Sequence, residues 1–421
     1  MTAPAPVREA REGEAVAEVT VCVPAYRAAE FLHHTLVAVQ RQSFPRFVVE
    51  VGVEAEEGDE TERACAPFAG DPRFRVRRNA GTLGWDRNVA SLLARVATPF
   101  FAILPHDDVW HPRYLEALMA RLRPRPDAMT AYADMYLFGR AQGSERSRLP
   151  DAGLGPRLLA YFLQGAEAHA WRGLTRAGAA MPPFPSNDFG GFAIECEWGL
   201  GLLREGVALR LPEPLYFKRV RCLDTPSVSA GWTTRLPKAD LELALEHHRQ
   251  QMLAGIPFAS LDRAHAQAIE LAAEAAMLRR WMHFGMYFGD GPFGLRPEQV
   301  DRAGRLLAAA GESVVPGARE ITAMTLLALA RHHRVAGDAP ESERLALAAT
   351  SAATEHWEAY VHLAWLQLDR GEPQEALRLA FAAAAIEPTD WTVRTLVDAC
   401  DRRLAGDYAE GADAGGSPPI G

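Results

Sequence analysis

PFFAILPHDD, residues 99–108, places an uninterrupted apolar run directly before a histidine and two aspartates. A short apolar run of this kind predicts a strand that is buried on both faces of a sheet. Three further runs precede it, with segments of helical periodicity between them: VTVCVPAY at 19–26, FVVEVGV at 47–53 and FRVRRN at 74–79. Strands that alternate with helices predict a Rossmann-like, doubly wound and mostly parallel α/β sheet.

The two aspartates after the fourth run, Asp107 and Asp108, are the strongest candidates for a functional site. Ligands of doubly wound sheets bind beyond the carboxyl ends of the strands. Carboxylates at such a position can hold Mg²⁺ or Mn²⁺, which prefer oxygen ligands and leave positions for phosphate oxygens. The alternative is that Asp108 only caps the helix that starts near residue 111.

The ends of the other three strands also carry residues suited to a nucleotide. The tripeptide 24–26 offers backbone N–H groups and a tyrosine ring, although proline after a strand is also common in turns. Glu54 could accept a hydrogen bond from a base or a ribose, whereas the acidic run after it is usual for a solvated surface. Gly84 permits close approach of a ligand, and Arg87 supplies positive charge where a helix starts.

From residue 236 to 405 the sequence becomes rich in Ala, Leu, Arg and Glu at helical spacing, which predicts an all-helical region. The segment 329–349 recurs loosely as 363–383, a period of 34 residues that is typical of tetratricopeptide repeats. The repeat is clearest over 357–390. The alternative is an alanine-rich helical bundle with chance matches. The tails 1–17 and 406–421 are predicted to be disordered.

Composition excludes some classes of protein. The net charge of −9 argues against a protein that coats nucleic acid or an anionic membrane. No stretch approaches eighteen uncharged apolar residues, and the N-terminal segment has no apolar core of a secretory signal. The five cysteines lie far apart, which argues against a disulfide framework or a zinc knuckle. These observations together predict a cytoplasmic protein.

The ordered series of motifs resembles glycosyltransferase family 2. VTVCVPAYRAAEFLHHTLVAVQRQSFP is similar to the family's first strand, Pro-x-Tyr-Asn turn and helix, and VEVGVEAEEGDET to its second strand and acidic loop. GTLGWDRNVASLL resembles the Gly-x-x-x-Ala-Arg-Asn helix start, and FAILPHDDVWHPRYLEAL the Asp-x-Asp segment. RGLTRAG, IECEWGLGLLREG and PLYFKRVRCLDTPSVSAGW resemble the acceptor half. The match spans about residues 18–232.

The resemblance implies a GT-A fold and the transfer of a hexosyl or related group from a nucleotide-diphosphate sugar, with inversion at the anomeric carbon. It also implies roles for individual positions. The positions that match the nucleotide and diphosphate site are Pro24, Ala25, Tyr26, Glu54, Gly84, Arg87 and Asp107. Asp107 and Asp108 match the metal-binding acids, so the resemblance implies Mn²⁺ or Mg²⁺. Glu195 or Glu197 matches the carboxylate that deprotonates the acceptor hydroxyl, with Asp188 as a rival.

Several departures from the family pattern bear on activity. One acid is missing after Glu54, and the acid expected two residues before Asp107 is Pro105. Arg221 stands where many members have a further metal-binding histidine, and a cation there could neutralise the diphosphate directly. A second hypothesis is therefore a catalytically degenerate domain that acts as a scaffold. In both hypotheses the helical region could bind a protein partner or a second copy of the chain. For the enzyme hypothesis, the sequence does not identify the acceptor.

Overall fold

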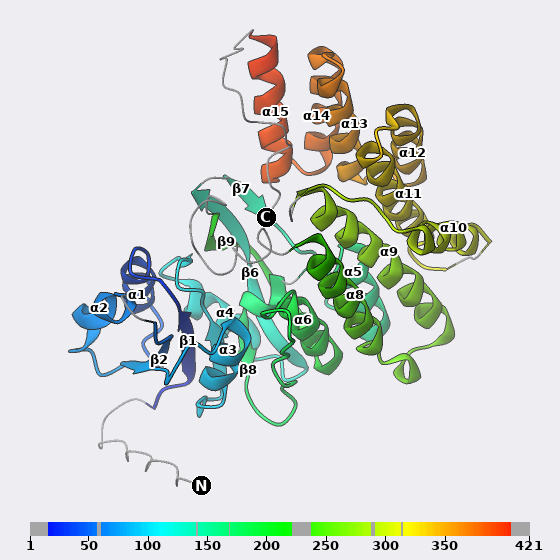
Figure 1. Ribbon diagram of the computed structural model, residues 1–421. Coiled ribbons are helices and arrows are strands. Elements are labelled where there is room, and N and C mark those ends of the chain that lie inside the picture. Colours follow the sequence, from blue (N-terminus) through cyan, green and yellow to red (C-terminus); the bar gives the residue numbers. More distant parts are fainter. Residues whose placement is uncertain are drawn as a thin grey trace.

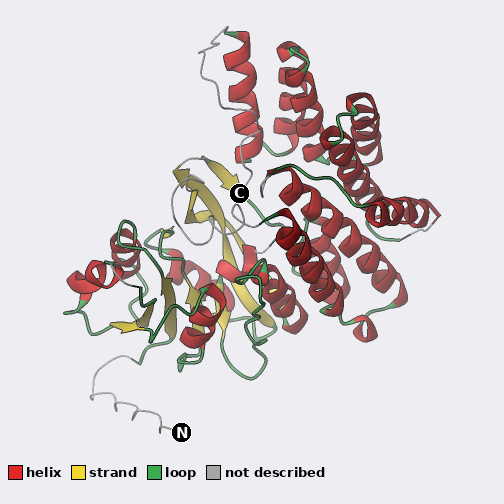
Figure 2. Cartoon of the chain, viewed as in Figure 1, coloured by secondary structure: helices red, strands yellow, loops and turns green. Residues whose placement is uncertain are grey.

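The computed structural model describes residues 16–56, 60–139, 142–167, 169–220, 237–287, 291–312 and 315–405. A nine-stranded sheet occupies the first half of the chain (Figure 2). Its strands are β1 (Val19–Ala25), β2 (Phe47–Val53), β3 (Phe74–Arg78), β4 (Phe100–Ile103), β5 (Val109–Trp110), β6 (Ala128–Gly139), β7 (Gly143–Glu145), β8 (Leu174–Arg176) and β9 (Val207–Val220). The predicted strands at 19–26, 47–53, 74–79 and 99–105 correspond to β1 to β4.

The strand order is β3-β2-β1-β4-β8-β6-β9-β5, with β7 beside β6. Strands β1 to β4 are parallel to one another, as predicted. Strand β8 runs antiparallel between β4 and β6, whereas β6 and β9 form a long parallel pair. Every residue of β1 is buried, because β1 lies between β2 and β4 and helices cover both faces of the sheet.

Helices cover the two faces of the sheet (Figure 1). The helices of this half are α1 (Leu32–Gln40), α2 (Thr61–Cys65), η1 (Ala66–Phe68), α3 (Trp85–Leu93), α4 (Tyr114–Leu122), α5 (Leu154–Leu163), η2 (His169–Arg172) and α6 (Ile194–Glu205). Residues of α1 and α4 share one apolar cluster with the sheet, and residues of α3 and α6 share another. Helix α3 begins at Trp85, directly after Gly84.

The second half of the chain is helical throughout its described residues, as predicted (Figure 2). Its helices are α8 (Lys238–Ala254), η3 (Phe258–Ser260), α9 (Arg263–Tyr287), α10 (Pro297–Glu312), α11 (Ala318–Val335), α12 (Ala339–Ala352), α13 (Trp357–Asp369), α14 (Pro373–Ile386) and α15 (Trp391–Leu404). The described part of the chain contains no helix that is long and apolar enough to cross a membrane.

The 34-residue period of the sequence recurs in the positions of the last helices. Helices α12 and α14 begin at Ala339 and Pro373, and helices α13 and α15 begin at Trp357 and Trp391. The glycines that precede α12 and α14 have φ angles of 80° and 79°. Equivalent turns therefore separate equivalent helices.

The two halves share a hydrophobic core. One cluster of buried residues runs from α5 and α6 into α8, α9 and the helices up to α15. The boundary predicted at 232–236 lies outside the described residues, as does most of each predicted tail, 1–17 and 406–421. The chain also returns to the sheet at its far end, where the Ser144 N–H donates to the Thr389 carbonyl over 2.7 Å, next to a bridge between Ser144 and Asp390. Figure 1 shows α15 standing over β7.

Candidate active site

The carboxyl ends of β1, β2 and β4 lie together at one edge of the sheet. The Glu54 N–H donates to the Ala25 carbonyl over 3.0 Å, and His106 Nδ1 lies 3.2 Å from the Pro24 carbonyl oxygen. The structure therefore brings the tripeptide 24–26, Glu54 and Asp107 to one place, as the sequence predicts for a parallel sheet.

Glu54 holds the loop that leads into α3. The residue is only 3% exposed, and Oε2 accepts a hydrogen bond from the Leu83 N–H over 2.6 Å. Burial raises the pKa of Glu54 above its usual value. One carboxylate oxygen of Glu54 is thus engaged by the protein's own loop, next to Gly84.

Tyr26, Arg27 and Glu56 form a polar rim beside the end of β1. Arg27 Nε donates to Glu56 Oε2 over 2.8 Å, and the guanidinium lies 5.3 Å from the centre of the Tyr26 ring. Hydrogen bonds from Arg27 and Tyr26 lower the pKa of Glu56. The tyrosine ring is thus held at the edge where a nucleotide is expected.

Asp108 is fixed to β9 rather than exposed. It is 2% exposed, Oδ2 accepts from the Tyr216 hydroxyl over 2.6 Å, and Oδ1 accepts from the Arg219 N–H over 2.8 Å. Burial and the neighbouring Asp107 raise the pKa of Asp108 to about 6, against the opposing effect of Arg172, whose Nε lies 3.8 Å from Oδ2. Asp108 therefore links the loop after β4 to strand β9 through two hydrogen bonds.

Arg219 places a cation beside Asp107. Its Nε donates to the Asp107 carbonyl over 3.2 Å, and its guanidinium lies 4.4 Å from the Phe31 ring centre and 4.5 Å from the Phe138 ring centre. No sequence motif predicts Arg219, Tyr216 or Arg172 as individual site residues. The one local signal was the pair of cations near the end of the strand-like LPEPLYFKRV.

The donor atoms near Asp107 bear on metal binding. Among the described residues, no group of three or more His, Cys, Asp or Glu side chains is arranged to hold a metal ion. Both oxygens of Asp108 already accept hydrogen bonds from the protein. Mg²⁺ is commonly bound through one or two carboxylates together with substrate phosphates. The described residues fit a metal ion shared with a diphosphate, and they do not fit a closed cage made by the protein alone.

Arg87 and Arg221 are the remaining two residues that the sequence predicts for the donor site. Arg87 is exposed at the third position of α3, shortly after the loop that Glu54 holds. It makes no ion pair with another described residue, so its charge faces solvent at this end of the helix. Arg221 lies outside the described residues.

The three candidate bases have different surroundings. Glu195 lines a cavity of about 560 Å³. Glu197 instead lies 3.1 Å from His248 Nδ1 of α8, and burial together with Glu195 raises its pKa to about 7. Asp188 is exposed in a loop whose turn is made by Asn187, the side-chain oxygen of which accepts from the backbone N–H groups of residues 189, 191 and 192.

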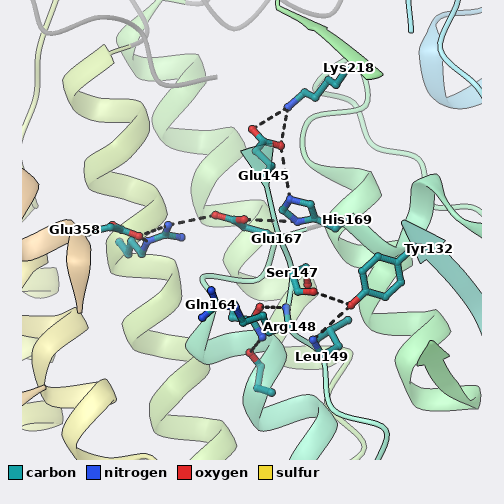
Figure 3. Close-up of polar contacts among 12 residues, drawn as sticks. Tyr132, Glu145, Ser147, Arg148, Leu149, Gln164, Glu167, His169, Lys218 and Glu358 are labelled. Atoms are coloured by element: carbon teal, nitrogen blue, oxygen red, sulfur yellow. Dashed lines mark hydrogen bonds and ion pairs between the residues drawn. The ribbon is translucent and has the colours of Figure 1, made fainter. Parts of the chain in front are cut away.

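The cavity lies between the sheet and the helical half. Residues of β6, β7, β9, η2 and α6 form one wall, and residues of α9, α11, α13 and α15 form the other. Arg172 lines it and lies over the Trp171 ring, 4.4 Å from the ring centre. A chain of close polar contacts crosses it from Lys218 to Glu358 (Figure 3). Its intermediate members are Glu145, His169, Glu167 and Arg279. Arg172 therefore connects the cavity with the carboxyl edge of the sheet, because it also lies next to Asp108.

The first part of the chain matches a known protein family. Residues 20–161 match the model of Glycosyl transferase family 2. This part of the chain is therefore similar to that family. The match runs from β1 into α5, so it contains the carboxyl ends of β1, β2 and β4 but neither α6 nor β9. No curated protein matches the sequence.

Solved structures share the fold of this chain. The structure of S. aureus TarS residues 1–349 with UDP-GlcNAc aligns over 78% of this chain and 90% of its own length, at 15% identity and a TM-score of 0.54. The structure of a longer S. aureus TarS chain aligns over 78% of this chain and 54% of its own length, at 15% identity and a TM-score of 0.52. The sheet of the first half is therefore a GT-A-like sheet, followed by helices.

Proposed function

We propose that the protein is an inverting glycosyltransferase that moves a sugar from a nucleotide-diphosphate sugar to an acceptor hydroxyl in glycan or glycoconjugate biosynthesis. The family 2 match over residues 20–161 carries this proposal, because it covers the strand ends that gather the acidic and aromatic residues. The GT-A-like fold supports it.

The donor would bind along the carboxyl edge of the sheet. Pro24, Ala25 and Tyr26 would line the nucleotide, and Glu54 would keep the loop before α3 in place beside it. Arg219 and Arg87 would face the diphosphate, where positive charge offsets the charge that develops on the leaving group. Asp108 would act indirectly, by holding Tyr216 and Arg219.

A Mn²⁺ or Mg²⁺ ion, when bound, would be held by Asp107 and the diphosphate oxygens, and it would stabilise the negative charge of the leaving nucleotide. Protein side chains would supply the other interactions with the diphosphate. Arg219, stacked between two phenylalanine rings, would keep a fixed cation at the same place in the absence of a closed metal cage.

Glu195 is the proposed general base. It lines the cavity next to Arg172, whereas Glu197 is engaged by His248 and Asp188 is exposed. Glu195 would take the proton of the acceptor hydroxyl. The hydroxyl oxygen of the acceptor would attack the anomeric carbon from the face opposite the nucleotide, so the configuration of that carbon would be inverted as the nucleotide leaves.

Donor binding is tested with a panel of nucleotide-diphosphate sugars in the presence of Mn²⁺. We expect one donor to raise the unfolding temperature of the wild type, because a ligand of the folded state stabilises it by mass action. We expect slow hydrolysis of the same donor, and loss of that hydrolysis in Asp107→Asn. If no donor shifts the unfolding temperature, or if Asp107→Asn hydrolyses the donor as fast as the wild type, the enzymatic proposal fails.

The alternative function is a scaffold that acts through the helical half. The recurrence of helix starts at 34-residue intervals favours a tetratricopeptide-like arrangement, which could hold a protein partner or a second copy of the chain. A scaffold with a degenerate catalytic domain would bind no donor in the panel above, so the same measurement separates the two functions. A cytoplasmic location stays a prediction.

A further inference from the structure

We propose that the cavity between the sheet and the helical half binds the acceptor, and that this acceptor is an uncharged saccharide rather than a polyanion. The proposal rests on the proposed function and names the substrate class for the acceptor side of the same site. Three observations carry it: the position of the cavity, its unpartnered polar atoms, and the balance of charge along its walls.

The cavity begins at the candidate base and reaches into the helical half. Glu195 and Arg172 lie on its sheet side, and Arg172 approaches Asp108 to 3.8 Å. Arg280 of α9 and the two tryptophans that begin α13 and α15 lie on its helical side. An acceptor that occupies this space would present a hydroxyl to Glu195 while its remainder contacts the helices.

Buried polar atoms without a hydrogen-bond partner collect around this cavity. Within the described residues these include Arg172 Nε, Arg280 Nε and His356 Nε2. Buried polar groups in folded proteins are nearly always hydrogen-bonded, and an unsatisfied group is costly. Burial also lowers the pKa of His356 to about 4, so this imidazole is neutral at pH 7. Neutral imidazole and guanidinium N–H groups are suitable partners for sugar hydroxyls.

The charge of the walls favours a neutral ligand. The lining contains eight Asp and Glu residues and six Arg and Lys residues. Most of the cations are already paired, as Figure 3 shows for Lys218 with Glu145, and as Arg279 and Arg331 pair with Glu358 at 2.6 and 3.1 Å. Burial raises the pKa of Asp390 to about 7, so near pH 7 the ionised carboxylates only slightly outnumber the cations, and a polyanion would still meet a small excess of negative charge. A hydroxyl both donates to carboxylates and accepts from guanidinium groups, so it suits this mixed lining.

The lining also contains aromatic residues. Phe284, Trp357 and Trp391 contribute to it, and the Arg280 guanidinium lies 5.8 Å from the Phe284 ring centre. Aromatic faces pack against the C–H faces of sugar rings. The volume of about 560 Å³ lies within the range of about 300–1,000 Å³ found for small-molecule sites.

The test measures binding of two sets of saccharides to the full-length protein. One set holds neutral trisaccharides of glucose, mannose, galactose and N-acetylglucosamine, and the other holds sulfated or uronic-acid oligosaccharides of equal length. We expect at least one neutral probe to bind in calorimetry or saturation-transfer NMR, and we expect Arg280→Gln to weaken it about ten- to a hundredfold. Arg280→Lys, which keeps the charge but lacks Nε, should weaken it as well. Arg305→Gln, an exposed substitution on α10, should leave binding unchanged.

Thermal unfolding of each variant, with and without the nucleotide sugar, checks that the variant is folded and binds donor. Binding of the anionic set alone, no binding by either set to a protein that binds donor, or wild-type affinity in Arg280→Gln would overturn the acceptor proposal. Binding of a neutral probe by a protein that binds no donor would instead overturn the proposed glycosyltransferase function and leave a saccharide-binding cavity.

Discussion

Glu195 and Glu197 lie two residues apart in the first turn of α6, and their different surroundings predict different phenotypes. Glu195→Gln should keep donor binding and lower transfer about 10²- to 10⁴-fold, because it removes the proposed base. Glu197→Gln should retain transfer within a few-fold, because its partner is His248 in the core between α6 and α8. Initial rates with one donor and one acceptor measure both. A larger loss in Glu197→Gln than in Glu195→Gln would assign the base to Glu197.

The raised pKa of Glu197 predicts a pH-dependent stability. The pKa is about 7 in the folded protein against a usual value of 4.5, so the folded state holds a proton that the unfolded chain has lost. The free energy of unfolding should therefore fall as pH rises from about 4.5 to 7. Glu197→Gln removes this penalty, so it should match the wild type near pH 4.5 and exceed it by about 2–3 kcal/mol at pH 8. Denaturant unfolding at the two pH values tests this, and an equal difference at both would contradict it.

The sequence predicted the part of the site that follows directly from local order. Asp107 and Asp108 could be found because two acids follow an apolar strand, and the structure places them at the sheet edge with residues 24–26. Arg172, Tyr216 and Arg219 could not be found in the same way, because they reach Asp107 and Asp108 only through the pairing of strands that are far apart in the chain. No residue spacing encodes such contacts.

The elements of the fold show the same division between local and distant order. Strands β1 to β4 were predictable, because each is a short apolar run between helical segments. The positions of β8 and β9 were not, because β8 inserts antiparallel between β4 and β6, and β9 pairs with β6 some 80 residues earlier. The helical half was predictable as helix, but its packing on α5 and α6 was not. Amphipathic periodicity shows which face of a helix is buried, and it does not show which other element covers that face.

The contact between β7 and α15 predicts the effect of a single methyl group. A Cβ added at Gly143 would lie 2.6 Å from the Trp391 Cβ and 2.7 Å from its Cα. Gly143→Ala should therefore lower the free energy of unfolding by about 1–3 kcal/mol, because the strand and the helix must separate. Gly304→Ala is the matched control, because nothing lies within 4 Å of its Cβ position in α10. It should raise stability by up to about 1 kcal/mol through helix propensity. Similar stabilities of the two variants would show that β7 and α15 do not touch.

At the scale of the whole molecule, the shared core predicts one unfolding transition. Apolar side chains of α5 and α6 are buried by α8 and α9, in the same cluster as the later helices. Differential scanning calorimetry of the full chain should give a single peak with a van't Hoff enthalpy close to the calorimetric enthalpy. A fragment of residues 1–232 should bind a hydrophobic dye such as ANS, because it exposes the faces that the helices cover. Two separate peaks, or a stable fragment that binds no dye, would show that the halves are independent domains.

The return of the chain to the sheet at residues 389–391 also bears on synthesis in the cell. The wall of the cavity that includes Trp357 and Trp391 does not exist until the ribosome has translated almost the whole chain. Strands β1 to β4, in contrast, are complete once about a quarter of the residues have left the exit tunnel. The nascent chain can thus form the first strand ends of the proposed donor site long before the proposed acceptor cavity, and a ribosome that stalls in the helical half leaves a product that lacks this cavity.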